Sequence, residues 1–185
     1  MAAAADHHGH RHDAPPAAEA RAGQSLYQLD GRFVDQAGAP AGIDVARGHP
    51  VIITMMYASC PDACPRLIAD IRRIEAAVPA GAREALHVVL VSVDPGHDTP
   101  AVLRSLAAAH GVGARWHFLT GSDDLAGVLG VKYRRLSTGA INHSSVITLL
   151  DRAGVIDSRL EGIAQPIDAL VARVVAVSNI PRAAR

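Results

Sequence analysis

The sequence predicts an α/β domain with a mixed central sheet flanked by helices, preceded by an N-terminal β-hairpin extension. Apolar runs of strand length alternate along the chain with segments whose apolar residues recur at helical spacing. The run PVIITMMYA at 50–58 is β-branched and continuously apolar, which indicates a strand covered on both faces. The two runs at 144–151 and 155–160 are separated by a short turn, so the last two strands are expected to be antiparallel.

Length and composition exclude several classes of protein. A chain of 185 residues is expected to form one domain, and 49% hydrophobic with 19% charged residues excludes wholesale disorder. Lys+Arg and Asp+Glu number 18 each, which argues against a nucleic-acid partner, and 3% aromatic residues are too few for a base-stacking surface. No apolar run is long enough for a membrane span.

Residues 1–24 read as a flexible His/Ala/Pro-rich tail, and residues 25–180 as a single domain. The tail lacks the charged start and apolar middle of a secretion signal, so either the protein stays inside or a leader has been removed. Its histidines suit weak metal binding and, equally, a passive tail. They are His7, His8, His10 and His12.

The first elements are predicted from turn and cap residues. The segment 25–40 is expected to form a hairpin around Asp30-Gly31, a strong turn dipeptide. A helix should follow the strand at 50–58, because apolar residues recur at helical spacing over 63–77. Asp62 stands at its N-cap, and Pro65 falls in the first turn, where a missing N–H has no cost.

The second half of the chain continues the alternation, and we expect strands at 86–93, 144–151 and 155–160 and helices at 100–110, 122–129 and from Pro166 onward. Thr99-Pro100 opens the first of these helices as cap and first residue. The order hairpin, β-α-β, one or two helices and β-β-α matches the thioredoxin-like fold. Fold alone does not determine function.

The chemistry is expected in the loop between the buried strand and its helix, where the only two cysteines, Cys60 and Cys64, lie. Ligand sites form at the carboxyl ends of strands in an α/β sheet, and a helix N-terminus stabilises a thiolate. Dithiol oxidoreductases of the thioredoxin type have two intervening residues, whereas this loop has three and leaves more room for a metal. Two thiolates are soft ligands and favour copper(I).

His143 is the best candidate for a third ligand. It stands at the start of a predicted strand after a polar loop, and in a thioredoxin-like fold that corner faces the cysteine loop. Two thiolates and one imidazole make a three-coordinate copper(I) site, and copper(II) could use them with one further ligand. A structural disulfide is a weaker explanation, because closing so short a loop gains only about 2 kcal/mol or less.

Other polar residues are given structural interpretations. Asp94 and Asp98 are expected to form turns and caps rather than to line the copper loop or move protons. His97 is interpreted as a solvated loop residue rather than a fourth ligand, and Trp116 as a packing or partner-contact residue near the site loops. The spacing of the remaining histidines does not argue for a metal. They are His49, His87, His110 and His117.

Five strings in order resemble those of one protein family. They are CPDACP at 60–65, VSVDPGHDTP at 91–100, RWHFLTGS at 115–122, His143-Ser144 before a strand, and LDRAG at 150–154. Each is similar to a segment of the Sco/SenC family, and the resemblance covers about residues 25–177 in register. A CxxxC pair alone would be weak, whereas this ordered set is specific.

The resemblance implies a thioredoxin-like copper protein that helps to assemble the dinuclear copper centre of cytochrome c oxidase. It implies copper binding by Cys60, Cys64 and His143, and the oxidase subunit that bears this centre as partner. Other copper chaperones or thioredoxin-like reductants are further candidate partners. The implied location is the periplasm or the outer face of the cytoplasmic membrane, where most members are tethered by an N-terminal helix.

Two departures from the family pattern stand out. The family often has Asp before the ligand histidine, whereas this chain has Asn142, which removes a negative charge near the metal. The tether is also absent here, so either the helix was cut away or this member is freely soluble. Three functions stay open: a metallochaperone, a thiol-disulfide reductase acting on the target's cysteines, and a peroxidase or redox sensor. The peroxiredoxin pattern of Pro and Thr at fixed positions upstream of the reactive cysteine is missing from TMMYASC.

Overall fold

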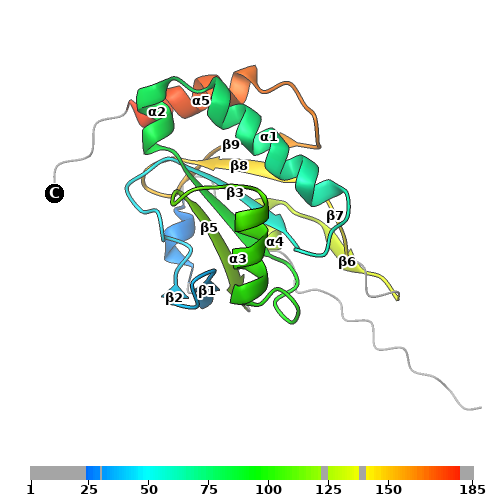
Figure 1. Ribbon diagram of the computed structural model, residues 1–185. Coiled ribbons are helices and arrows are strands. Elements are labelled where there is room, and N and C mark those ends of the chain that lie inside the picture. Colours follow the sequence, from blue (N-terminus) through cyan, green and yellow to red (C-terminus); the bar gives the residue numbers. More distant parts are fainter. Residues whose placement is uncertain (1–23, 30, 122–124, 138–140, 180–185) are drawn as a thin grey trace, which may run out of the picture.

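The computed structural model describes residues 24–29, 31–121, 125–137 and 141–179. A seven-stranded mixed sheet runs through the molecule in the order β2-β1-β5-β4-β3-β8-β9 (Figure 1). Its strands are β1 (Phe33–Asp35), β2 (Pro40–Ala41), β3 (Val51–Met56), β4 (His87–Ser92), β5 (Trp116–Gly121), β8 (Val146–Leu150) and β9 (Ile156–Glu161). A separate two-stranded sheet pairs β6 (Tyr133–Arg135) with β7 (Ile141–His143).

The parallel part of the sheet is formed by β3, β4 and β5, and the other pairings are antiparallel. Every residue of β3 is buried, which confirms the prediction from its uninterrupted apolar run. Because parallel strands end at the same edge, the loops after β3 and β4 lie together there. This mixed sheet with flanking helices confirms the predicted fold class.

Helices cover both faces of the sheet. Above one face lie α1 (Ala63–Ala77), α2 (Ala80–Ala85) and α5 (Asp168–Ser178), with α3 (Pro100–Ala109) beside them (Figure 1). A 3₁₀ turn, η1 (Leu26–Gln28), and α4 (Ala126–Leu129) pack against the other face. The described residues contain no helix that is both long and apolar enough to cross a membrane.

Helix α1 has the predicted bounds, and its position fixes the cysteine loop. Asp62 is its N-cap residue but makes no side-chain cap hydrogen bond; its carboxylate instead lies 3.5 Å from Arg66. The apolar stripe of α1 includes Leu67 and Ile71, both fully buried. Burying two such side chains contributes about 3–6 kcal/mol, enough to hold the first turn of the helix against the sheet.

The N-terminal hairpin is present, but its turn is not at the predicted place. Strand β1 pairs with β2 around Ala37-Gly38, whereas the segment before Gly31 contains the 3₁₀ turn; Asp30 lies outside the described residues. The Asp35 carboxylate accepts the N–H groups of Ala37 and Ala39, and Gly38 has a φ of +90°. Asp-mediated turn hydrogen bonds with a glycine at positive φ fix the hairpin there.

Several other elements differ from prediction or were not predicted. Pro166 precedes α5 instead of opening it, because Ile167 is the N-cap residue. The predicted start of α4 at 122–124 and the tail at 1–23 lie outside the described residues, although α4 ends at Leu129 as expected. The elements that sequence reasoning did not assign are α2, β5 and the β6–β7 hairpin.

Candidate metal centre

The loop from β3 to α1 brings both cysteines to the carboxyl edge of the sheet. Cys60 lies in the loop, and Cys64 occupies the first turn of α1. The Cys64 N–H donates to the Cys60 Sγ at 3.3 Å, so a free amide of the helix terminus faces the first sulfur. Both thiols are unpaired and buried. This arrangement stabilises a thiolate at Cys60 and keeps bulk water away from it.

His143 reaches the cysteines from the β6–β7 hairpin. It is the last residue of β7 rather than the start of the next strand as predicted, because β8 begins at Val146. Two hydrogen bonds between Ser144 and Lys132 close the base of the hairpin. The Ser144 N–H donates to the Lys132 carbonyl oxygen at 2.8 Å, and the Lys132 N–H donates to the Ser144 hydroxyl oxygen at 2.9 Å. The His143 Nε2 lies 3.9 Å from the Cys64 Sγ.

The backbone sets the tautomer of the His143 ring. Its Nδ1 lies 3.1 Å from the Ser144 carbonyl oxygen, which can only accept, so Nδ1 carries the proton. The Nε2 lone pair therefore faces the Cys64 sulfur. Burial lowers the pKa of His143, and the carbonyl offsets only part of this effect. The imidazole is thus neutral at physiological pH, which is the form that binds a metal.

The two thiols differ in acidity. Burial raises the pKa of Cys60, but hydrogen bonds from the Cys64 and Asp62 backbone and from the Cys64 and Tyr57 side chains outweigh it, so its pKa is lowered. Burial raises the pKa of Cys64 to about 12, with a smaller contribution from Cys60. Cys60 is therefore the more easily ionised sulfur, and Cys64 retains its proton when no metal is bound.

Tyr57 is a site residue that sequence reasoning missed. Burial and then a hydrogen bond with Cys60 raise the pKa of its hydroxyl to about 12, so it stays a neutral donor. Its ring meets the His143 ring edge-on, with centroids 5.6 Å apart and planes at 72°. A tyrosine three residues before the first cysteine was the available signal. Tyr57 therefore contacts both the first cysteine and the imidazole of the site.

Asp98 holds the cysteine loop through hydrogen bonds to its backbone. It is only 2% exposed, and its two carboxylate oxygens accept the Ala58 N–H at 3.0 and 3.2 Å. The Ser92 hydroxyl donates to it at 2.6 Å. Burial raises the pKa of Asp98, and the hydrogen bonds from Ser92 and Ala58 oppose that effect. The structure thus gives Asp98 the structural role expected for it, because it holds the backbone of Ala58, two residues before Cys60.

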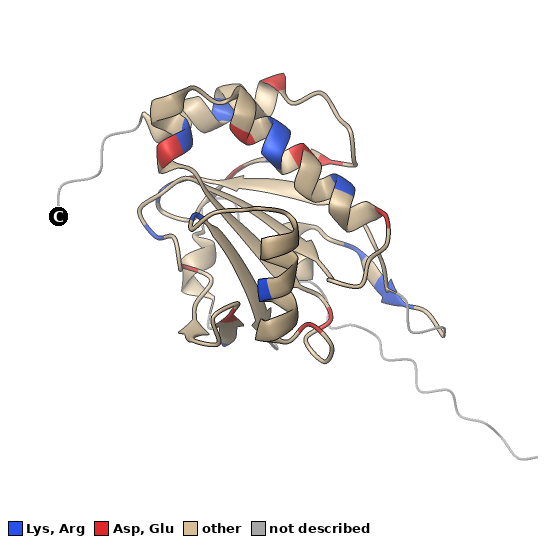
Figure 2. Cartoon of the chain, in the orientation of Figure 1, with Lys and Arg blue, Asp and Glu red and all other residues tan. Residues whose placement is uncertain are grey.

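Asp94 links the same edge of the sheet to the hairpin that carries His143. Its carboxylate accepts from Arg135 on β6 at 2.7 Å and lies 3.0 Å from the His97 Nδ1. Burial raises the pKa of Asp94, but the hydrogen bonds with His97 and Arg135 outweigh it and lower the pKa. In Figure 2 the basic stretch of β6 and the acidic loop after β4 lie toward the same end of the molecule. The His97 ring is exposed and paired with Asp94, away from any ligand role.

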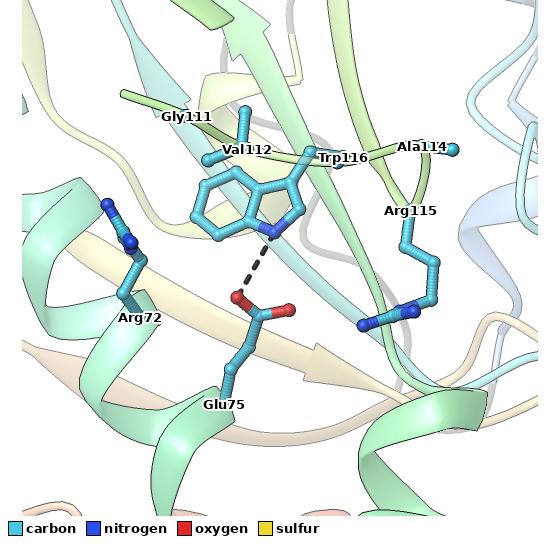
Figure 3. Close-up of a pocket in the computed structure, with 8 residues that line it drawn as sticks. Arg72, Glu75, Gly111, Val112, Ala114, Arg115 and Trp116 are labelled. Atoms are coloured by element: carbon cyan, nitrogen blue, oxygen red, sulfur yellow. Dashed lines mark hydrogen bonds between the residues drawn. The ribbon is translucent and has the colours of Figure 1, made fainter. Parts of the chain in front are cut away.

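Trp116 lies far from the cysteine loop, which corrects the prediction that placed it near the site. It begins β5, at the edge of the sheet opposite to the one that carries the cysteines. Its indole N–H donates to Glu75 at 3.1 Å, and the ring is 3% exposed (Figure 3). It borders a cavity of about 210 Å³ together with Arg72 and Arg115. Its burial gives it a packing role, which is one of the two roles predicted for it.

The predicted ligands are brought together in part. Cys64 and His143 are in contact, and Cys60 is joined to Cys64 through the backbone N–H. Across the described ranges, no group of three or more His, Cys, Asp or Glu side chains is arranged so that it could hold a metal ion. A common ligand set would therefore require a rotation of the Cys60 side chain or of its loop.

The unequal acidity of the thiols predicts selective alkylation. At neutral pH and with one equivalent of iodoacetamide, Cys60 should be modified at least about tenfold faster than Cys64, because only thiolates react. Peptide mapping by mass spectrometry measures the two rates. Unfolding in urea supplies the control, since both thiols should then react alike. Equal rates in the folded protein would contradict the assignment of Cys60 as the ionised sulfur.

Fold and site together define a class: a thioredoxin-like domain with a buried dithiol at a strand–helix junction and an imidazole facing it. Comparison with known proteins gives the family. The SCO1/SenC family model matches residues 20–178, and the chain belongs to this family.

Curated relatives agree with this assignment. A protein of Stutzerimonas stutzeri whose name contains the words "copper-binding protein" is 34% identical over 90 residues, covering 49% of this chain and 43% of its own. A SCO2-like protein of Rickettsia prowazekii is 30% identical over 133 residues, 66% of this chain and 63% of its own. The chain thus spans less than two thirds of the length of these relatives.

Solved structures share the fold. A SCO1/SenC family lipoprotein from Bacillus anthracis superposes with a TM-score of 0.72 at 20% identity, over 85% of this chain and 99% of its own. Bradyrhizobium japonicum ScoI, solved with copper bound, superposes with a TM-score of 0.65 at 23% identity, over 80% of this chain and 96% of its own. BsSco, a member of the Sco family of cytochrome c oxidase assembly proteins, superposes with a TM-score of 0.68 at 19% identity, over 85% of this chain and 100% of its own.

Proposed function

We propose that this protein binds copper through Cys60, Cys64 and His143 and delivers it to cytochrome c oxidase. The observation that carries the proposal is the 3.9 Å between the Cys64 Sγ and the His143 Nε2. In a trigonal site with the sulfur about 2.3 Å and the nitrogen about 2.0 Å from the ion, these atoms lie about 3.7 Å apart. The sulfur–nitrogen separation therefore already suits a copper ion between them.

The ligand chemistry favours copper over other metals. Two thiolates and a neutral imidazole form a soft set, which suits copper(I) in three-coordination. Copper(II) could use the same set with one further ligand, and Asn142 beside His143 brings no carboxylate to that position. Membership of the SCO1/SenC family and the copper-bound ScoI structure support copper as the cargo.

Delivery to the acceptor requires the ion to pass between sulfur ligands. A thiolate of the acceptor can join the ion before the Cys60 thiolate leaves, so no free ion forms. The acidic Cys60 is suited to leave first, whereas Cys64 recovers its proton after transfer. The acceptor is the oxidase subunit that bears the dinuclear copper site, with BsSco supporting the link to oxidase assembly.

We place this activity outside the cytoplasmic membrane. A lipoprotein among the solved relatives supports a membrane-anchored, extracytoplasmic location. Oxidised cysteines formed there need a thioredoxin-like reductant, because a Cys60–Cys64 disulfide cannot bind copper. Such a reductant, or a second copper chaperone that loads the site, is a further partner.

A copper titration with ligand identification tests the metal site. The reduced full chain should bind one copper(I) tightly, and X-ray absorption should show two sulfur neighbours and one nitrogen. Cys60→Ala and Cys64→Ala should each reduce the sulfur count by one, and His143→Ala should remove the nitrogen. Tight binding unchanged in all three variants would overturn the proposal.

The second candidate function is a thiol-disulfide reductase, favoured by the difference in acidity of the two thiols. The Cys60 thiolate attacks a disulfide of the target and forms a mixed disulfide. Cys64 then loses its proton and attacks the Cys60 sulfur, and the bond between Cys60 and the target breaks. The target thiolate leaves, so the target ends with two thiols and this chain with a Cys60–Cys64 disulfide. His143→Ala should retain this reaction with an oxidised target peptide while losing copper, which separates the two functions.

The ion pair between Arg135 on β6 and Asp94 in the loop after β4, which we call the hairpin clamp, predicts an effect of Arg135 on copper affinity. Arg135→Gln removes the 2.7 Å ion pair with Asp94, so the hairpin holds His143 less firmly against the cysteines. We expect copper(I) affinity to fall by about 10-fold, as for loss of an outer-shell partner. Competition with a chromogenic copper(I) chelator measures it. Arg134→Gln, on the same exposed strand, is the matched control, and an equal fall in both variants would contradict the clamp.

A further inference from the structure

Three histidines meet at the edge of the sheet opposite to the cysteines. His49 precedes β3, His87 is the first residue of β4, and His117 is the second residue of β5. Their spacing in the sequence gives no metal motif, but the parallel register of the three strands brings their rings to one edge. All three are half-buried, so each has both a fixed position and access to solvent.

Their rings form one continuous stack. The His87 Nδ1 lies 3.0 Å from the His117 Nε2, with ring centroids 5.3 Å apart and planes within 7°. The His49 ring lies 4.4 Å from that of His87, tilted by 43°. The His49 Nδ1 lies 3.2 Å from the Ala85 carbonyl oxygen and donates to it, which leaves its Nε2 lone pair free of that hydrogen bond.

We propose that His87 and His117, completed by His49, form a second metal site that takes copper(II) in tetragonal coordination. Two nitrogens about 2.05 Å from one ion and at right angles to each other are about 2.9 Å apart. The 3.0 Å between the His87 Nδ1 and the His117 Nε2 matches that separation. The ion takes the place of the proton that now lies between the two nitrogens.

Binding requires only local changes in the rings. Both facing nitrogens offer lone pairs when His87 carries its proton on Nε2 and His117 carries its proton on Nδ1. The rings then rotate so that these lone pairs converge, since no group of three such side chains in the described part of the chain is yet arranged to hold an ion. His49, already in contact with His87, reaches the ion by turning its own ring.

The electrostatics keep these imidazoles available to a metal. Burial, and then the neighbouring His49, His117 and Arg115, lower the pKa of His87 to about 4. Burial also lowers the pKa of His117, with Asp35 opposing. Neither ring is protonated at neutral pH, so no proton competes for the nitrogens. The positive charge of Arg115 opposes a cation here and the negative charge of Asp35 favours it.

This site is independent of the proposed cysteine site. It lies at the other end of the parallel strands and contains only nitrogen ligands, which suit borderline copper(II) rather than soft copper(I). Failure of one site therefore leaves the other untouched. A protein that carries both would hold the two oxidation states of one metal at opposite ends of the same sheet.

Copper(II) titration of a prepared background tests the proposal. In the full chain, Cys60→Ser, Cys64→Ser and alanine at the four tail histidines remove competing ligands. We expect one equivalent of copper(II), with an electron paramagnetic resonance spectrum of two or three imidazole nitrogens and no sulfur. His87→Gln and His117→Gln should each weaken binding at least tenfold. His110→Gln, a histidine outside the stack, should leave it unchanged.

A second measurement avoids dependence on variants that fold poorly. Titration of the same background with zinc(II), followed by NMR of the histidine ring nitrogens, should shift the signals of His49, His87 and His117 first. The proposal is overturned if copper(II) affinity is unchanged in both glutamine variants, or if zinc(II) shifts other histidines instead. Absence of stoichiometric binding would also overturn it and leave the stack as a hydrogen-bonded structural feature.

Discussion

Replacing Cys60 with serine is expected to lower copper(I) affinity by more than about 100-fold. Loss of an outer-shell partner of a metal ligand costs up to about 100-fold, and loss of a ligand itself should cost more. Cys60 is the thiol whose pKa is lowered, so it supplies the thiolate at the smallest cost in proton release. A serine hydroxyl is hard, stays protonated and cannot replace it. Competition against a copper(I) chelator of known affinity, under reducing conditions, measures the change.

The control for this substitution is Ser59→Ala, one residue earlier in the same loop. It should retain wild-type affinity, because the loop backbone is unchanged and no ligand is lost. The Cys60→Ser protein should also unfold at nearly the wild-type temperature, since an oxygen in place of sulfur leaves the packing of α1 intact. Wild-type affinity in Cys60→Ser would show that the cysteine pair does not bind the ion as proposed.

Asp98→Ala should cause the largest loss of stability among the polar residues near the site. It removes the acceptor of the Ala58 N–H and of the Ser92 hydroxyl at a position that is 2% exposed. Leaving these buried donors without a partner costs about 3 kcal/mol, since each unsatisfied group costs about 1–3 kcal/mol. For a domain of this size the melting temperature should fall by about 6–12 °C, measurable by circular dichroism.

Two further variants make the Asp98 prediction specific. Asp98→Asn retains one acceptor oxygen and should lose about half as much stability. Asp44→Ala removes an exposed carboxylate paired with Arg47 and should change the free energy of unfolding by less than about 1 kcal/mol. Because Ala58 lies two residues before Cys60, Asp98→Ala should also weaken copper binding. A wild-type melting temperature in Asp98→Ala would contradict this network.

Elements defined by local signals were predicted well. Helix α1 was predicted at its observed bounds from apolar spacing, and α3 was predicted from Thr99-Pro100. The Thr99 hydroxyl caps α3 by accepting the Val102 N–H. The hairpin turn was placed wrongly because two turn signals compete in one segment. The signal around Gly38 prevails through the carboxylate of Asp35, a contact that composition does not reveal.

The site was predictable to the extent that its residues follow from chain order. The two cysteines stand at a strand–helix junction, which the apolar run before them and the helical spacing after them identify. The contact between His143 and Cys64 spans 79 positions and depends on the β6–β7 hairpin, which was not predicted. Tyr57 was missed because its place three residues before Cys60 is only a weak signal, and its contact with the His143 ring depends on the β6–β7 hairpin.

The sequence by itself determined the class of fold, the dithiol loop and the identity of the third candidate ligand, because strand and helix periodicity and the nature of a thiol are properties of neighbouring residues. Only the tertiary structure decided which thiol is the more acidic, which carboxylates brace the loop and hairpin, and that three scattered histidines form one stack. Each of these depends on burial and on distances between residues far apart in the chain. Such distances are fixed by how the strands pair and how the helices pack on them.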